Sequence, residues 1–172
     1  MDLSLKNKNA LVCGSSAGIG KASAIEFIEA TFDTTFHILI NNTGGPKGGP
    51  IFSAEVEEFT KAFSQHLVCN QILVQNVVPG MKEAGYGRII NIISTSVKQP
   101  IDGLGVSNTI RGAVANWSKT MANELGAFGI TVNNVLPGFT ATDRLDDIVA
   151  NASKKMNKTE KEAGEFMKNL VP

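Results

Sequence analysis

Short apolar runs alternate along this chain with longer segments of helical periodicity. The apolar runs are rich in Ile, Leu and Val and cover residues 9–14, 36–42, 88–94 and 131–136. Runs of this length without polar alternation are typical of strands that are buried on both faces of a parallel sheet. The pattern therefore predicts four parallel strands.

The segments between and after these strands carry apolar residues at intervals of three and four, which is the period of an α-helix. They predict helices over 18–28, 54–82 and 106–125, with Pro79-Gly80 interrupting the second late, and a polar helical tail over 144–170. Strands that alternate with helices indicate parallel βαβ units with helices on both faces of the sheet. The expected fold class is therefore α/β, in a single domain over 1–172.

Four short motifs follow the four predicted strands: Gly14-x-x-x-Gly18-x-Gly20, Asn41-Asn42, Ser94 and Pro137-Gly138. Taken alone, each motif also fits an ordinary turn. Ligands of open parallel sheets bind beyond the carboxyl ends of the strands, and all four motifs lie there. Glycines between a strand and a helix let backbone N–H groups approach a phosphate, and the helix N-terminus adds positive charge. We therefore expect a nucleotide to bind at this edge.

Composition narrows the choice of partners. The chain has 16 basic and 16 acidic residues, so nucleic acid and an anionic membrane are not expected partners. No apolar stretch approaches the ~20 residues of a membrane span. Cys13 and Cys69 lack metal-ligand spacing, so we expect buried, reduced thiols, no metal site and a cytoplasmic location.

The segments around these motifs resemble the short-chain dehydrogenase/reductase family, and within it the 3-oxoacyl-(acyl carrier protein) reductases. They are 11–20, 40–44, 87–94 and 130–142. The resemblance implies a Rossmann-type, doubly wound parallel sheet that binds NAD or NADP. It also implies hydride transfer between nicotinamide and a small-molecule carbonyl or alcohol, and a homodimer or homotetramer with the long helices as contact elements.

The resemblance assigns cofactor-binding residues as well. The pyrophosphate would be surrounded by Gly14, Ser16, Gly18, Ile19 and Gly20. The adenosine side would be lined by Asn42 and Gly44, and the nicotinamide amide by Pro137, Gly138 and Thr142.

The family's catalytic set matches only in part. Ser94 is similar to the serine that holds the substrate oxygen. Ser107 stands where the family has its catalytic Tyr, Arg111 where it has Lys, and His66 where it has an Asn. Serine is far less acidic than tyrosine, and arginine does not deprotonate near neutral pH. Arg111 keeps the positive charge and can hold the nicotinamide ribose, but the usual proton donor is missing.

The source of the proton therefore stays open between Ser107, His66, a bound water and a group of the substrate. Tyr86 is the only tyrosine, and it precedes Ser94 by a strand length of roughly 26 Å. His66 equally fits a helix histidine that is hydrogen-bonded to a backbone carbonyl. An alternative function is a catalytically silent dinucleotide-binding protein that acts as a sensor or partner subunit, and a third is a structural homologue that binds no dinucleotide.

The chain is short for this fold. Only sixteen residues lie between Gly20 and His37, whereas one βαβ unit takes ~30 residues. We therefore expect part of the first half of the sheet to be missing, and the resemblance implies that the family's C-terminal strand is missing as well. Either the sequence joins separate segments, with a junction between Glu26 and Phe36, or the chain is a genuine short form. The unpaired strand edges that a short form would expose favour the first explanation.

Overall fold

The structure is a computed structural model that describes residues 5–15, 35–138 and 143–168. The chain forms two compact units, Met1–Leu136 and Pro137–Pro172, which are described separately. The single domain over 1–172 stays a prediction. The helix predicted over 18–28 lies outside the described residues.

Four parallel strands form the sheet of the first unit, in the order β1-β2-β3-β4. They are β1 (Ala10–Ser15), β2 (Ile38–Thr43), β3 (Gly87–Ile92) and β4 (Ile130–Val135). Each strand begins and ends within two residues of its apolar run, so the prediction of four parallel strands is confirmed. The agreement arises because only Ile, Leu and Val runs fill both faces of such a sheet.

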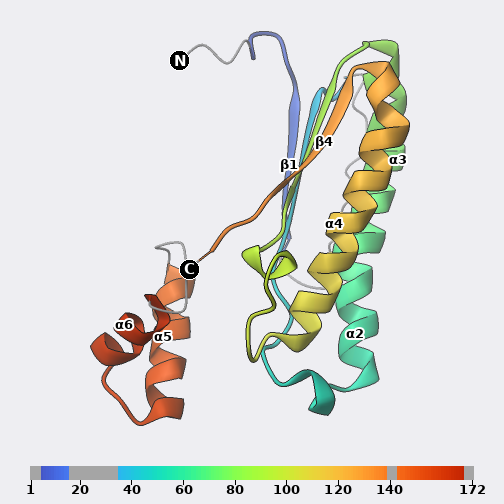
Figure 1. Cartoon of the computed structure of the whole chain (residues 1–172). Helices are drawn as coiled ribbons and strands as arrows, with labels where there is room; N and C mark the ends of the chain where they lie inside the picture. The colour runs from blue at the N-terminus through green and yellow to red at the C-terminus, as the bar shows by residue number, and fades with distance from the viewer. Residues whose placement is uncertain (1–4, 16–34, 139–142, 169–172) are drawn as a thin grey trace. The chain divides into compact units, whose positions relative to one another are not determined.

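Long helices cover one face of this sheet, as Figure 1 shows for α3 and α4. They are α2 (Val56–Phe63), a π-helical turn at Ser64–Val68, α3 (Cys69–Glu83) and α4 (Gly105–Leu125). The predicted helix over 106–125 is confirmed, and that over 54–82 is continuous but contains the π-helical turn. The described helices of this unit thus account for one face of the doubly wound fold. No helix in the described ranges is long and apolar enough to cross a bilayer.

The hydrophobic core lies between this face and the helices. Leu39, Ile89 and Ile130 of the sheet are almost completely buried against Val74 and Met81 of α3. Burying a side chain of this size contributes about 1.5–3 kcal/mol. Side chains along a strand alternate between the two faces of the sheet, and this alternation places these residues on the same face as Leu11 and Val132.

The predicted interruption at Pro79-Gly80 is wrong, because α3 continues through Pro79 to Glu83. Proline removes one N–H from the helix, which leaves the carbonyl of Gln75 without its usual partner. Gln75 is exposed, so water can hydrogen-bond to that carbonyl. The loss of one hydrogen bond near the end of a long, packed helix is therefore too small to terminate the helix.

A buried row of asparagines crosses the helix-covered face of the sheet. Asn41 of β2 is in register with Asn91 of β3, which is in register with Asn134 of β4. Asn41 Nδ2 donates to Asn91 Oδ1 at 2.8 Å. Asn91 Nδ2 donates to Asn134 Oδ1 at 3.3 Å and to Ser118 Oγ of α4 at 2.9 Å. Buried amides are costly when unpaired, so this amide row fixes the strand register and docks α4 on it.

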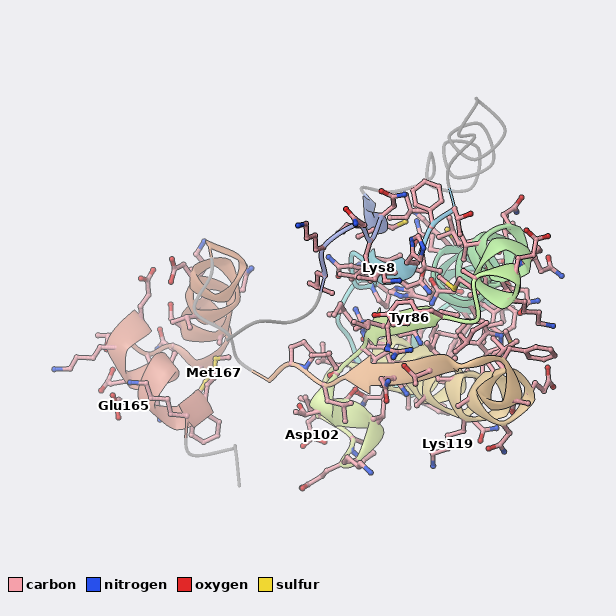
Figure 2. The ribbon with its side chains drawn as sticks, turned by 90° about the horizontal axis from the view of Figure 1, so that it is seen from above. Lys8, Tyr86, Asp102, Lys119, Glu165 and Met167 are labelled. Carbon is pink, nitrogen blue, oxygen red and sulfur yellow. The ribbon has the colours of Figure 1, made fainter. Side chains whose placement is uncertain are left out.

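Tyr86 lies at the opposite, amino-terminal end of the strands. It directly precedes β3, and its ring centre is 4.1 Å from Lys8 Nζ and 4.2 Å from Arg88 Cζ. Figure 2 shows Lys8 and Tyr86 at this end of the sheet. A cation over an aromatic face is attracted to the ring, so each of these two contacts helps to hold the Tyr86 side chain. The prediction that Tyr86 is a strand length away from Ser94 is confirmed.

The second unit contains two helices, α5 (Asp143–Met156) and α6 (Glu160–Lys168), in place of the single helical tail predicted. The break has a local cause. Asn157 adopts a left-handed φ of 51°, and Thr159 caps α6. Glu162 Oε2 accepts from the Thr159 backbone N–H at 2.9 Å, and Thr159 Oγ1 accepts from the Glu162 N–H at 3.3 Å. This reciprocal pair is a capping box, which begins a new helix.

Replacing Asn91 tests the amide row. Asn91→Leu keeps the branched shape of the side chain but leaves the Asn41 Nδ2 donor unpaired and removes the hydrogen bonds that Asn91 donates to Ser118 and Asn134. We therefore expect a loss of about 2–4 kcal/mol of unfolding free energy. The measurement is urea denaturation followed by circular dichroism. Asn133→Leu, at the exposed neighbour on β4, is the control and should change stability by less than about 0.5 kcal/mol. Equal losses in both variants would contradict a role for the row.

Candidate functional site

Ser94 lies just beyond the carboxyl end of β3. Its Oγ accepts a hydrogen bond from the backbone N–H of Ser96 at 3.1 Å, which begins the short turn Thr95–Val97. This bond uses a lone pair of the hydroxyl and leaves its own hydrogen available to donate. The turn packs against α4. Ser94 is therefore held in place and has a free donor, as a residue that binds a carbonyl oxygen requires.

Ser107 and Arg111 lie one turn apart on the buried side of α4. Arg111 Nη1 donates to the carbonyl oxygen of Ile92 at 3.0 Å, at the end of β3. This bond anchors the first turns of α4 against the carboxyl end of the sheet. Ser107 and Arg111 are 9% and 8% exposed, so both act in a largely water-excluded environment.

His66 lies at the centre of the π-helical turn between α2 and α3, and this turn packs against α4. The ring is 3% exposed, and its Nδ1 lies 2.5 Å from Oγ1 of Thr43 at the end of β2. A π-turn inside a helix often marks a functional position, because it redirects side chains at one point. The turn here brings an imidazole from the helix layer to the end of β2.

The environment keeps His66 neutral. Burial, and after it the positive charge of Arg111, lower the pKa of His66 from 6.5 to about 4, while a backbone hydrogen bond with Gly44 acts in the opposite direction. A buried cation next to an imidazole disfavours a second positive charge. At neutral pH the ring is therefore not an imidazolium acid, and it can accept a hydrogen bond or exchange tautomers.

The Gly/Pro loop after β2 is fixed to the start of α4. Gly49 N–H donates to the Gly103 carbonyl at 2.7 Å, and Gly105 N–H donates to the Gly49 carbonyl at 3.2 Å. A Cβ on Gly105 would lie 2.5 Å from Cβ of Ile51, which is closer than such atoms approach. Glycine at 105 thus permits the loop to sit against the helix that carries Ser107.

The structure describes some of the predicted cofactor residues. Gly14 lies in β1. Asn42 is exposed near the end of β2, and Gly44 directly follows that strand. Pro137 and Gly138 follow β4 and belong to the second unit. Five further residues lie outside the described ranges: Ser16, Gly18, Ile19, Gly20 and Thr142.

Other site features were not predicted. Thr43 contacts His66, and the amide row includes Asn91, Asn134 and Ser118. Within the Asn41-Asn42 motif, Asn41 connects the ends of two neighbouring strands through its bond to Asn91. The signal for the row was present in the sequence, because Asn41, Asn91 and Asn134 interrupt three apolar runs at similar offsets.

The two cysteines are free thiols in the core. Burial, and after it the proximity of Cys69, raises the pKa of Cys13 to about 11. Burial also raises the pKa of Cys69. Thiols that stay protonated are poor nucleophiles and metal ligands. Within the described ranges, no three His, Cys, Asp or Glu side chains are grouped as metal ligands would be.

Comparison with known proteins connects this geometry to a family. A family model described as short chain dehydrogenase matches residues 29–153. The NADPH-dependent reductase BacG of Bacillus subtilis is 32% identical over 78% of this chain and 52% of its own. A 3-oxoacyl-[acyl-carrier-protein] reductase of Synechocystis is 28% identical over 78% of this chain and 56% of its own.

A solved structure is similar as well. L-Sorbose reductase from Gluconobacter frateurii, complexed with NADPH and L-sorbose, superimposes with a TM-score of 0.70 at 27% identity, over 80% of this chain and 52% of that one. The present chain spans about half the length of the curated relatives it matches.

The stability of the fold should depend on pH through His66. The pKa of His66 is near 4 in the folded state and 6.5 in the unfolded chain. The contribution of the neutral ring to the unfolding free energy is therefore fully present above pH 6.5 and is lost as the pH falls toward 4. The loss is up to about 3 kcal/mol. Urea denaturation at several pH values measures it. His66→Gln is the control, and the stability difference between wild type and variant should change over this range; a constant difference would contradict a neutral, buried His66.

Gly105→Ala should displace the loop from α4. The added methyl group overlaps Ile51, so we expect a loss of about 1–3 kcal/mol. Gly112→Ala, in the same helix but facing open space, is the matched control and should stabilise the protein by up to about 1 kcal/mol. Thermal unfolding compares the two. A neutral Gly105→Ala would show that the loop does not depend on this contact.

Proposed function

Because the chain belongs to the short chain dehydrogenase family, we propose that it is an NAD(P)-dependent oxidoreductase. The reaction is hydride transfer between nicotinamide and the carbon of a carbonyl or alcohol. The observation that carries the proposal is that three side chains lie at the carboxyl ends of β2 and β3: Ser94 follows β3, Arg111 donates to the Ile92 carbonyl, and His66 contacts Thr43. Ligands of parallel sheets bind at this edge.

The residues at this edge fit a dinucleotide. Arg111 supplies a permanent positive charge at the carboxyl end of β3, where it donates to the Ile92 carbonyl. The exposed amide of Asn42 and the glycine at 44 suit a sugar and its hydroxyl groups. When bound, the nicotinamide supplies or accepts the hydride. Arg111 would hold its ribose, and the Ser94 hydroxyl would donate to the substrate oxygen.

The proton is handled by Ser107, by water or by a relay through His66. Ser107 is on the same helix face as Arg111. The cation next to it favours loss of a proton, but a serine hydroxyl remains a weak acid. His66 is neutral and can pass a proton only by taking one at one nitrogen while releasing one at the other. We therefore expect turnover to be slower than with a tyrosine acid.

Relatives guide the choice of ligands. BacG is named as NADPH-dependent, and L-sorbose reductase was solved with NADPH and L-sorbose. NADPH is therefore the first cofactor to test, with NADH as comparison. The substrate panel comprises L-sorbose, gluconate and a 3-oxoacyl thioester, after the names of the relatives. A cytoplasmic homodimer or homotetramer remains our expectation for the assembly, which light scattering can measure.

Restoring the family's acid tests the proposal. The double variant Ser107→Tyr, Arg111→Lys should raise kcat/KM for NADPH-dependent ketone reduction by about tenfold or more, since a placed general acid contributes about 10²–10⁴. Ser107→Phe, Arg111→Lys has the same bulk without the hydroxyl and should give no gain. Circular dichroism verifies that both variants fold.

The remaining outcomes separate the alternatives. Tight NADPH binding by calorimetry, with no turnover in the wild type or in the double variant, would refute catalysis and identify a silent dinucleotide-binding protein. Absence of a thermal shift with NAD(H) and NADP(H) would refute cofactor binding itself.

A further inference from the structure

The face of the sheet opposite α3 and α4 carries a group of apolar side chains. Val12 of β1, Ile40 of β2 and Ile90 of β3 are in register and lie side by side on that face. Ile92 of β3 and Val135 of β4 are in register two residues further along. Val12 is 64% exposed and Val135 is 48% exposed, and the three isoleucines are partly buried. These five residues are named the open-face patch.

The connections between the strands do not cover this patch. The chain passes from β2 to β3 through α2 and α3, and from β3 to β4 through α4, so it steps across the sheet in one direction. Right-handed crossovers in one direction place their helices on one face, where Figure 1 shows α3 and α4. The step from β1 to β2 has the same direction, so the rule assigns no cover of the patch to that connection either. Because parallel sheets are normally buried on both faces, we expect the cover to come from elsewhere.

The charge on this face allows it to meet a copy of itself. Arg88 is the one charged side chain that the four described strands place there. Its Nη1 donates to the carbonyl oxygens of Gly87 at 2.8 Å and Gly129 at 3.0 Å, and its Cζ lies 4.2 Å from the ring centre of Tyr86. These contacts hold the guanidinium at the amino-terminal end of β3. The open-face patch is therefore neutral, and two patches do not repel each other.

The size and shape of the face fit a second sheet. Four strands of six residues each form it. With strands about 4.8 Å apart and a rise of about 3.3 Å per residue, the face measures about 20 by 20 Å. Two sheets pack face to face about 10 Å apart, with their strands nearly aligned. A contact of roughly 400 Å² on each copy belongs to the small interfaces, whose complexes are weak and transient.

We propose that the open-face patch packs against the same patch of a second copy of this chain, sheet on sheet. The two copies are related by a twofold axis, so the same valines and isoleucines contribute from both sides. The contact uses the sheet and leaves the long helices, on its other face, available for other contacts. It involves no cofactor and does not rest on the proposed function. Because the interface is small, the dimer should dissociate on dilution.

Sedimentation velocity of the full chain tests the proposal. From low micromolar to several hundred micromolar concentration, we expect the mass to rise from one copy toward two. Val12→Lys adds a charge to the patch and should weaken association by about tenfold or more, because an unpaired charge resists burial. The matched control is Val56→Lys, at a valine of α2 that is 74% exposed, and it should not change association. Circular dichroism verifies that both variants fold.

Two results would overturn the proposal. One copy at every concentration would mean that no second copy covers the patch. Association that Val12→Lys does not weaken, or that Val56→Lys weakens equally, would place the contact on another surface.

Methyl NMR of the wild type gives a test that needs no variant to fold. On dilution, the methyl signals of Val12, Ile90 and Val135 should shift, whereas those of Val56 should not. Shifts confined to residues of α2, α3 and α4 would overturn the proposal in favour of a contact through the helices. Neither measurement contains NADPH, so its failure is distinct from a failure of the proposed function.

Discussion

The buried amide row is the interaction on which the rest of the first unit depends. Asn41, Asn91 and Asn134 bond across three adjacent strands, and Ser118 joins the row from α4. Van der Waals contact between Ile, Leu and Val side chains tolerates a shift of register more readily than directional bonds between buried amides do. The row therefore sets where each strand ends, and all ligand-facing residues follow from that alignment.

The position of α4 on the sheet also depends on polar contacts near the carboxyl ends of the strands. Arg111 bonds to the Ile92 carbonyl while Ser118, two turns further along α4, bonds to the amide row. Two polar anchors on one helix fix both its axial position and its rotation. A lysine at 111 would offer a point charge on a flexible stem, whereas the planar guanidinium donates to the Ile92 carbonyl in a fixed geometry. Arg111 thus has a structural as well as an electrostatic effect at this edge of the sheet.

Periodicity predicted the strands and α4 to within two residues, because these elements are buried on extended faces and their apolar pattern records it. Periodicity failed where a local polar contact determines whether a helix ends or continues. The capping box at Thr159 divides the tail, and the helix through Pro79 continues because the lost bond faces water. The position of Ser94 after β3 followed from motif order, and that of Arg111 on α4 from the predicted helix over 106–125. The contact between Thr43 and His66 could not be predicted, because it depends on a π-turn that has no periodic signature.

The residues that the resemblance places at the family's catalytic positions influence one another electrostatically. A lysine can lower its own charge when buried, but Arg111 cannot, so the cation next to His66 is permanent. That charge and burial keep the imidazole neutral. An imidazole with a pKa near 4 is too weak a base to remove a proton from a hydroxyl group at neutral pH. Arg111 therefore favours a neutral imidazole at position 66, and under the proposed function the proton moves through Ser107, through water or by a relay in which the neutral ring gains one hydrogen as it releases another.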